Sequence, residues 1–390
     1  MSAFLKILMV VESHVKGAGG GPVYWAHLSD HLIRRGHQVQ IISGVVPNTE
    51  FASPNTVGVI PVRADLRSRS GLTLVSRYMF RQRFISAVRA FVEEWSPDII
   101  HTVPPVASEA ALHAGKMCGI PVLASILSHV EAQWTYLESN RLRARFFLQL
   151  ESRAIRRPFC RIICLTHHSL RVLQAVGIPE ERLVHVPHAV DTQRFSSKAS
   201  PRFRTQLGLP EDSFVIGYAG SLSREKGTDQ LLEAMAQHAD DPNLVLLVAG
   251  DHSVAARRRI DLGRKLPKVH FLGRLDHEDM PSFMASIDLF VIPSMTETLP
   301  TTLLEALATG VPVMATAVGG IEEFIKDRFG IVLAASQVEE IAKGLDAVLS
   351  QRGELAAMGK AGQVYVQQHH NWELASELTE GVYQACLKNQ

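Results

Sequence analysis

The stretch that decides the fold is Pro293-Ser-Met-Thr-Glu297-Thr-Leu-Pro-Thr-Thr-Leu-Leu-Glu305-Ala-Leu-Ala-Thr-Gly310. It follows an apolar run, residues 289–292, that has the length and composition of a buried strand. Pro300 suits the first turn of a helix, where its missing N–H costs nothing. Glu297 is therefore expected just before a helix and Glu305 just over one turn into it, with free amides between them for an anion. Taken singly, either glutamate is also explained by capping or by solvent exposure.

Short β-branched runs alternate with longer segments of helical period along the whole chain. This alternation predicts βαβ units and parallel sheets that are covered by helices on both faces. The predicted strands are 7–11, 39–42, 99–103, 122–126, 162–165, 215–218, 244–248, 289–292 and 311–315. They fall into two sets, so we predict two doubly wound, Rossmann-like α/β domains that face each other across a cleft, which suits a chain of 390 residues.

The domain boundary is predicted at a polar stretch, residues 191–207, which lacks a strand pattern and is typical of an interdomain linker. It separates a first domain, 1–190, from a second domain, 208–368, and a terminal helical segment, 369–390, follows. The apolar residues of that segment recur at every fourth position, which predicts one buried face. They are Leu374, Leu378, Val382 and Cys386.

Composition and charge narrow the functional classes. The apolar share of 46% and the charged share of 20% are ordinary for a folded protein. We expect neither a signal peptide nor a membrane span, because no apolar run approaches the required roughly 18 to 20 residues. Residues 1–195 carry 22 Lys and Arg against 14 Asp and Glu, whereas the remainder carries 18 against 25. This asymmetry indicates either an anionic partner for the first half or a complementary contact between the halves.

The cysteines are few and scattered, which argues against a disulfide framework and favours a reducing, cytoplasmic location. They are Cys118, Cys160, Cys164 and Cys386. Cys160 and Cys164, followed by His167 and His168, have a superficial metal-site spacing. A core strand is the better interpretation, because a tetrahedral zinc centre needs all four side chains to converge on one point. We therefore predict no bound metal.

In each half of the chain, a glycine-rich loop follows the first strand. The first, Ser13 to Pro22, includes Gly20 and Gly21 and is either a nucleotide-binding loop or a ligand-free turn. Pro22 displaces the last glycine of a dinucleotide fingerprint, so a nicotinamide cofactor is not expected. The second is Gly220-Ser-Leu-Ser-Arg224-Glu-Lys226-Gly227, where an arginine and a lysine at a strand-to-helix turn suit a diphosphate. Its Lys-Gly-Thr order is not that of a P-loop.

The segment around the two glutamates resembles the signature of the retaining glycosyltransferase family 4. The resemblance rests on two glutamates separated by seven residues and on the turn Ala308-Thr-Gly310-Val-Pro312-Val that follows. Most of the chain agrees, because further family-like motifs occur in the expected order. They are Arg35-Gly-His-Gln-Val39, Pro97-Asp-Ile-Ile-His101, Val186-Pro-His-Ala-Val-Asp-Thr-Gln-Arg-Phe195, Val248-Ala-Gly-Asp251, Phe271-Leu-Gly273 and Val318-Gly-Gly-Ile321.

The resemblance implies a GT-B architecture, with the acceptor on the first domain, the nucleotide sugar on the second, and the last helix returned to the first domain. It implies that Glu305 binds the ribose and Glu297 the transferred sugar, while Lys226 and Arg224 bind the diphosphate. The wider donor-binding set would include Gly20, Gly21, Gly220, Ser221, Leu299, Thr301 and Thr302. It also implies that the anomeric configuration is retained without a metal or other cofactor.

Three features depart from the family pattern or match it loosely. Ser221 stands where many members carry arginine, so Arg224 is expected to supply that charge. His188 and Ala189 replace the usual asparagine and glycine, which affects hinge geometry rather than chemistry. The acceptor-side histidine of the family corresponds best to His129, although the spacing is about two residues long and a structural histidine is nearly as good an interpretation. His101, at the end of its own strand, is equally ambiguous.

The basic residues of the first half gather in two aromatic-containing clusters, which suits docking on the anionic inner leaflet of a membrane. They are Arg63, Arg67, Arg69, Arg77, Arg81, Arg83 and Arg89, then Arg141, Arg143, Arg145, Arg153, Arg156 and Arg157, with Phe80, Phe84, Phe146 and Phe147 between them. A solvated or domain-facing surface is an equal alternative. Nucleic acid is not expected, because the net charge is only +1.

The leading functional hypothesis is sugar transfer from a UDP- or GDP-sugar to a glycan or lipid-linked acceptor in the synthesis of a cell-surface polysaccharide or glycolipid. The alternatives are a sugar-nucleotide epimerase of the same architecture and a catalytically silent binding protein. Retention of Glu297, Glu305 and Lys226 argues against the silent form. The donor sugar, its nucleotide, the acceptor, the linkage and the oligomeric state are not specified by the sequence.

Overall fold

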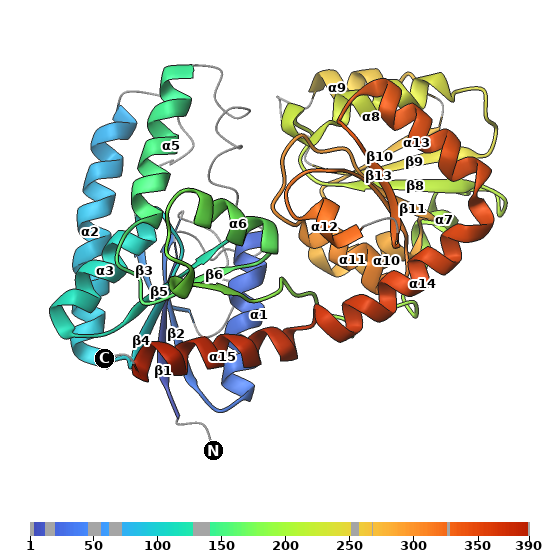
Figure 1. Cartoon of the computed structure of the whole chain (residues 1–390). Helices are drawn as coiled ribbons and strands as arrows, with labels where there is room; N and C mark the ends of the chain where they lie inside the picture. Colours follow the sequence, from blue (N-terminus) through green and yellow to red (C-terminus); the bar gives the residue numbers. More distant parts are fainter. Residues whose placement is uncertain are drawn as a thin grey trace. The chain divides into compact units, whose positions relative to one another are not determined.

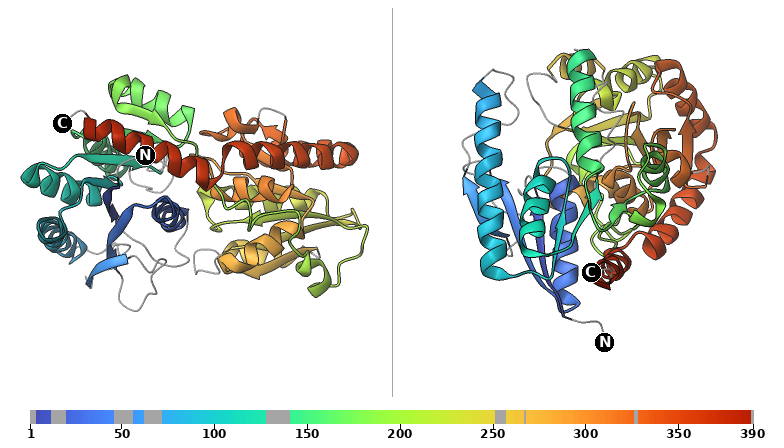
Figure 2. Two further views of the ribbon diagram at one scale, coloured as in Figure 1. Left: turned by 90° about the horizontal axis from the view of Figure 1, so that it is seen from below. Right: turned by 60° about the vertical axis from the view of Figure 1, so that its left-hand side comes forward.

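The computed structural model describes residues 4–11, 20–45, 56–61, 72–127, 141–250, 257–266, 268–325 and 328–388. The chain forms two compact units (Figure 1). The first combines Met1–Pro187 with Trp372–Gln390, and the second is His188–Asn371. Each unit has a parallel sheet with helices on both of its faces (Figure 2), which confirms the predicted pair of doubly wound α/β domains.

The first unit is built on a seven-stranded parallel sheet in the order β3-β2-β1-β4-β5-β6-β7. Its strands are β1 Lys6–Val11, β2 Gln38–Val45, β3 Thr56–Pro61, β4 Ile99–Thr102, β5 Val122–Ile126, β6 Ile162–Cys164 and β7 Leu183–His185. Its helices are α1 Gly20–Arg34, α2 Leu72–Trp95, α3 Val106–Cys118, α5 Arg141–Ile155, α6 His167–Ala175 and α15 Trp372–Lys388, with the 3-10 turn η1 Glu180–Arg182. None of the helices in the described part of the chain is long and apolar enough to cross a membrane.

The second unit is built on a six-stranded parallel sheet in the order β10-β9-β8-β11-β12-β13. Its strands are β8 Phe214–Ala219, β9 Leu244–Ala249, β10 Val269–Gly273, β11 Leu289–Ile292, β12 Val313–Thr316 and β13 Gly330–Leu333. Its helices are α7 Arg202–Gln206, α8 Thr228–Gln237, α9 Arg257–Gly263, α10 Met280–Ala285, α11 Thr301–Thr309, α12 Ile321–Ile325, α13 Val338–Ser350 and α14 Arg352–His369, with 3-10 turns η2 Arg224–Lys226 and η4 His277–Asp279.

The second sheet separates two apolar cores, one on each face. Val215 of β8 packs into the core beneath α10 and α11, whereas its neighbours Phe214 and Ile216 pack into the opposite core with α8 and α13. This alternation follows from the period of two in a β-strand. Strands that bury both faces read as continuous apolar runs in a sequence, and this property made most of them predictable.

Four strands are missing from the sequence-based prediction: β3, β7, β10 and β13. All four are edge strands: β3 and β7 lie at the two edges of the first sheet, and β10 and β13 at the two edges of the second. Their sequences are short or contain polar and glycine residues, as in Leu183–His185 and Gly330–Leu333. Edge strands need less apolar side chain than central ones, so their hydrophobic signal is weak.

The prediction that residues 191–207 form an interdomain linker is wrong, because the whole stretch belongs to the second unit. Phe195 and Phe203 are 1% and 6% exposed and lie in the core that also contains α10 and α11. Part of the stretch forms the helix α7, and Arg204 of this helix donates to Asp288 at 2.6 Å. Two buried aromatic residues therefore anchor a segment whose overall composition is polar.

The last helix, α15, belongs to the first unit, where it packs beside α1 (Figure 1). Its predicted buried face is confirmed at Val382 and Cys386 but wrong at Leu378, which is 39% exposed, and Leu374 is only partly buried. The buried side chains are Trp372, Ala375, Ser376, Thr379, Glu380, Val382, Tyr383 and Cys386. An α-helix has about 3.6 residues per turn, so residues spaced exactly four apart drift gradually around the helix and leave its buried face. Small and polar residues occupy the remaining positions of that face.

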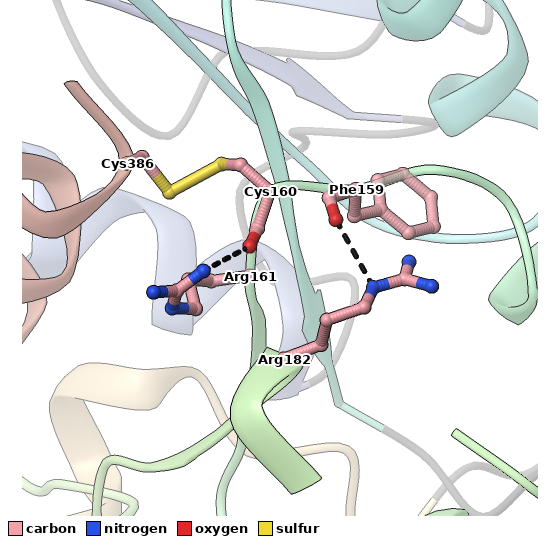
Figure 3. Close-up of a disulfide and its surroundings, with 5 residues drawn as sticks. All are labelled: Phe159, Cys160, Arg161, Arg182 and Cys386. Carbon is pink, nitrogen blue, oxygen red and sulfur yellow. Dashed lines mark hydrogen bonds between the residues drawn. A yellow bond between two sulfur atoms is a disulfide. The ribbon is translucent and has the colours of Figure 1, made fainter. Parts of the chain in front are cut away.

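The sulfur atoms of Cys160 and Cys386 form a disulfide that joins the segment just before β6 to the last turn of α15 (Figure 3). Their Cα atoms are 5.7 Å apart although 226 positions separate them in the sequence. The expectation of unpaired cysteines is therefore wrong, and with it the argument from cysteine usage for a reducing compartment. Spacing gave no hint of this pair, because only the return of the last helix brings the two residues together.

Candidate functional site

The second unit has a topological switch point between β8 and β11. The chain runs from β8 outward through β9 and β10, and then returns to add β11 on the other side of β8. The two strands are paired in parallel, with Leu289 opposite Ile216. Ligands of open α/β sheets bind outside the carboxyl ends of the strands at such a point. Here those ends lead into η2, which carries Arg224 and Lys226, and into the loop that carries Glu297.

Gly227 allows these two segments to touch. A Cβ atom at this position would lie 1.8 Å from the carbonyl oxygen of Pro293, and the residue has a φ of 66°. Only glycine combines that backbone conformation with so close an approach. The amide of Met295 donates to the carbonyl of Glu225 at 2.8 Å, which fixes the contact. The sequence therefore uses a glycine to hold Lys226 against the end of β11.

The Lys226 and Glu297 side chains form one cluster. The Lys226 Nζ lies 2.6 Å from Glu297 Oε1, and Ser294 Oγ donates to the same oxygen at 2.9 Å. The side chains of Lys226 and Glu297 are 30% and 13% exposed, so both are accessible to a ligand. An ammonium group has three N–H donors, and the contact with Glu297 uses one. This cluster can thus present a positive charge and an oriented carboxylate at the same place.

Glu305 is the buried member of the predicted pair. Its side chain is 5% exposed, and its Oε1 lies 3.5 Å from Nε2 of His277 in η4. A carboxylate with so little solvent needs polar partners, and a ligand hydroxyl is one kind of partner that it can take. His277 was not predicted as a site residue, because it precedes Glu305 by 28 positions, lies on a different element and is part of no recognisable motif.

The first turn of α11 lies between the two glutamates in sequence, as predicted. Pro300 caps the helix with extended geometry, φ −67° and ψ 135°, and makes no side-chain capping hydrogen bond. The amides of Thr301 and Thr302 have no acceptor within the helix, since the first four N–H groups of any helix lack one. Both residues are partly exposed. The hydroxyl of Thr301 lies 3.0 Å from Nε2 of His188.

The remaining predicted donor-binding residues of the second unit differ in exposure. Arg224 is exposed, and within the described residues its side chain has no ion pair or hydrogen bond. Ser221 is exposed as well, and its carbonyl accepts from the hydroxyl of Tyr218 at 2.7 Å. Gly220 immediately precedes it in the same loop. Leu299 is only 7% exposed and packs in the core, so its side chain anchors the loop.

Tyr218 lies beneath this loop and stays neutral. Burial raises the pKa of its phenol far above the ordinary value, and the negative charges of Glu297 and Glu225 raise it further. Its hydroxyl is a hydrogen-bond donor to the loop backbone rather than an acid. Tyr218 therefore supports the loop and was not identified from the sequence. Another unpredicted feature is Thr298, whose hydroxyl is buried without a hydrogen-bond partner in the described part of the chain.

The candidate residues of the first unit have other outcomes. Gly20 and Gly21 are the first two residues of α1. Residues 13–19 of the glycine-rich loop and His129 lie outside the described residues. Donor binding by the two glycines and acceptor contact by His129 stay predictions.

His101 is a structural histidine. It is completely buried, with Nδ1 2.8 Å from the Tyr383 hydroxyl and Nε2 2.7 Å from Ser125 Oγ. Burial lowers the pKa of the imidazole to about 3, so it is neutral at ordinary pH. Both ring nitrogens are thus occupied within the protein, and His101 connects β4, β5 and α15.

The cysteine and histidine side chains near β6 have different surroundings, and the prediction that they bind no metal stays a prediction. Cys160 is in the disulfide, and Cys164 is buried in β6, where burial raises the pKa of its thiol to about 12. The ring of His167 lies against that of His185, 3.9 Å between centroids. Over the described ranges, no group of three or more histidine, cysteine, aspartate or glutamate side chains is arranged to hold a metal ion.

Comparison with known families gives two matches that together span most of the chain. The family model described as "Glycosyltransferase Family 4" matches residues 18–194, and "Glycosyl transferases group 1" matches residues 199–365. A GDP-mannose-dependent mannosyltransferase of phosphatidylinositol monomannoside from Corynebacterium glutamicum is 31% identical over 300 residues, which are 72% of this chain and 74% of the relative. A GDP-mannose-dependent alpha-mannosyltransferase from Mycolicibacterium smegmatis is 28% identical over 341 residues, 84% of each chain.

Solved structures have the same architecture. Sucrose-phosphate synthase from Thermosynechococcus elongatus superposes with a TM-score of 0.84 at 23% identity, covering 99% of this chain and 100% of the other. The Anabaena protein HepE in complex with UDP and glucose gives 0.76 at 19% identity, covering 97% and 99%. These structural likenesses show the GT-B fold, and the sequence matches show the family. The chain belongs to glycosyltransferase family 4.

Proposed function

We propose that this glycosyltransferase moves a sugar from a nucleoside-diphosphate sugar to a glycan or lipid-linked acceptor, with retention of the anomeric configuration and without a metal ion. The observation that carries the proposal is the 2.6 Å contact between Lys226 and Glu297 at the β8/β11 switch point. A cation for the leaving diphosphate and a carboxylate for sugar hydroxyls are thereby held side by side.

The roles of the residues follow from where charge develops. As the glycosidic bond to the diphosphate breaks, negative charge grows on the leaving oxygen. Lys226, the exposed Arg224 and the free amides of α11 are suited to stabilise it, and preorganised donors of this kind give large rate effects. Glu305, nearly buried beside His277, is suited to accept two ribose hydroxyls. Glu297 orients the transferred sugar.

Retention is part of the proposal, because the same face of the sugar loses the diphosphate and receives the acceptor. In this scheme an oxygen of the departing diphosphate takes the proton of the acceptor hydroxyl. Lys226 and Arg224 then serve in place of the divalent ion that other phosphate-transfer sites use. NMR of the product anomer tests retention, and an undiminished rate after chelation with EDTA tests metal independence. A product with inverted configuration would contradict retention, and loss of activity in EDTA would contradict metal independence.

GDP-mannose is the first donor to test, since two relatives are named as GDP-mannose-dependent mannosyltransferases. A donor that binds only the folded protein raises its melting temperature with concentration. The experiment compares GDP-mannose with UDP-glucose on the wild type and on Glu305→Gln, with Glu322→Gln on exposed surface as the matched control. We expect stabilisation by one donor, lost only in Glu305→Gln. No stabilisation by any nucleotide would contradict the proposal.

We further propose that the protein attaches to the anionic inner leaflet of a membrane, a location that rests on its surface charge and no longer on its cysteines, two of which form a disulfide. Arg145 and Arg153 of α5, and Arg156 just after the helix, are exposed and support this location. The first arginine cluster, Arg63 to Arg89, contributes less, because Arg81 is paired with Glu109 and Phe84 is only 1% exposed. Residues 63, 67 and 69 lie outside the described residues. Sedimentation with anionic vesicles at low salt tests the idea, and equal recovery in the supernatant without and with vesicles would exclude it.

A further inference from the structure

His188 lies where the chain enters the second unit, and its backbone is held by the segment through which the chain leaves that unit. Nδ1 of His370 donates to the carbonyl of His188 at 2.7 Å, and the amide of Val190 donates to the carbonyl of His370 at 2.9 Å. The segment through which the chain enters the second unit is therefore hydrogen-bonded to the segment through which it leaves. His188 is 6% exposed, so its ring has a defined position.

The contacts of the His188 ring determine which nitrogen carries the proton. The amide of Ala189 donates to Nδ1 at 3.0 Å, so Nδ1 is an acceptor. Burial, and then the nearby His370, lower the pKa of His188 to about 4, so the ring is neutral. In a neutral imidazole the other nitrogen must carry the hydrogen. Nε2 therefore donates to the hydroxyl oxygen of Thr301, 3.0 Å away.

This donation decides what the Thr301 hydroxyl can do. Its oxygen receives the imidazole N–H, so its own hydrogen has to point to another acceptor. The protein atoms of the described ranges offer it none, and Thr301 is partly exposed at the first position of α11. The hydroxyl is thus prepared as a donor at the end of the helix that also presents free amides.

We propose that His188 is a positioning residue for donor binding, which orients the Thr301 hydroxyl to donate to an oxygen of the donor's diphosphate. This inference rests on the proposed function, because it assumes that the diphosphate lies at the start of α11. It assigns a role to His188, which stands where the family resemblance led us to expect asparagine. His188 acts only through Thr301 and does not touch the ligand.

Two replacements of His188 of similar shape test the roles of the two ring nitrogens separately. His188→Gln keeps a donor near the place of Nε2, whereas His188→Asn keeps an acceptor near the place of Nδ1. Thr301→Val removes the hydroxyl and Thr301→Ser keeps it. The probes are GDP and UDP, of which the one that binds the wild type is used, together with guanosine or uridine as the matching nucleoside without phosphate. Binding is measured by calorimetry.

A hydrogen bond to a charged oxygen is strong enough that Thr301→Val should weaken diphosphate binding about tenfold. His188→Asn should weaken it in the same direction by a smaller factor, about fivefold, because the hydroxyl remains but is no longer oriented. His188→Gln and Thr301→Ser should stay within about twofold of the wild type, and nucleoside affinity should not change in any variant. In the Thr301→Val background, His188→Asn should have no further effect, since the two act as one unit.

Four results would overturn the inference. Additive effects of His188→Asn and Thr301→Val would mean that the residues act independently. Equal weakening of diphosphate and nucleoside would mean that the ring only supports packing. Nitrogen NMR that showed the hydrogen on Nδ1 of His188 would remove the premise. If no nucleotide binds the wild type, or Lys226→Ala leaves diphosphate binding intact, the proposed function fails first. Normal binding in all His188 and Thr301 variants, with loss in Lys226→Ala, would remove this inference alone.

Discussion

Two polar clusters near the carboxyl ends of parallel strands differ in how completely the protein itself satisfies them. In the first unit, both ring nitrogens of His101 have partners in Ser125 and Tyr383, and the ring has no exposure. In the second unit, Lys226 and Glu297 are partly exposed, and the ammonium group has donors to spare. A closed cluster of this kind specifies packing, whereas an open one is available to a ligand.

The difference shows that a strand-end position alone does not identify a functional residue. His101 and Glu297 both follow or end a buried strand, and both were candidates on that ground. What separates them is the helix α15, which covers His101 with Tyr383. The predictions below test whether changes in the first cluster affect folding only and changes in the second affect transfer only.

The largest effect is expected from the disulfide beside the first cluster. Cys386→Ser should lower the free energy of unfolding of the first unit by about 3 kcal/mol, because the bond closes a very long loop. Chemical denaturation with tryptophan fluorescence measures it, and Cys118→Ser, at an exposed unpaired cysteine, is the control. Affinity for the nucleotide should be unchanged. Equal stability of the two variants under oxidising conditions would show that the bond does not form in solution.

Lys226→Ala should lower turnover by about 100-fold or more, because it removes a cation that we propose stabilises the leaving diphosphate. The melting temperature should change little, since an ion pair with this much exposure contributes little to stability. Lys343→Ala, which removes a 74% exposed lysine paired with Glu340, is the control. Steady-state transfer kinetics with the donor at saturation measure the effect. A near-normal rate would place the diphosphate elsewhere.

The pH dependence of stability should distinguish the clusters as well. The pKa of His101 is lowered from its ordinary 6.5 to about 3 by burial. Between those values the unfolded chain takes up a proton that the folded protein does not, so stability falls as the pH falls. From pH 7 to pH 5 this group alone should remove about 2 kcal/mol. Denaturant unfolding of wild type and His101→Gln at both pH values measures the difference, and identical pH slopes would refute the assignment.

The smallest effect tests the corrected face of α15. Leu378→Ala should change the free energy of unfolding by less than about 0.5 kcal/mol, because this leucine is exposed. Val382→Ala, one turn later and buried, should be destabilising by about 1 kcal/mol or more. Both are read from the same unfolding curves. A larger loss in Leu378→Ala than in Val382→Ala would restore the face that the four-residue repeat predicted.

The sequence by itself determined the class of fold, the central strands and the position of the two candidate donor-site glutamates on one contiguous stretch. Strands buried on both faces leave long apolar runs, and the segment from Pro293 to Gly310 carries its glutamates at fixed offsets from one helix start. Edge strands such as β7 and β13 were missed because they bury less apolar surface.

Only the tertiary structure decided the contacts between residues that are distant in the chain. Lys226 meets Glu297, His277 meets Glu305, His188 meets Thr301, and Cys160 meets Cys386. The predicted linker became part of the second unit for the same reason, since Phe195 and Phe203 bury themselves against distant helices. Periodicity reports the neighbours of a residue within one element, whereas these partners depend on how elements pack, which local pattern does not encode.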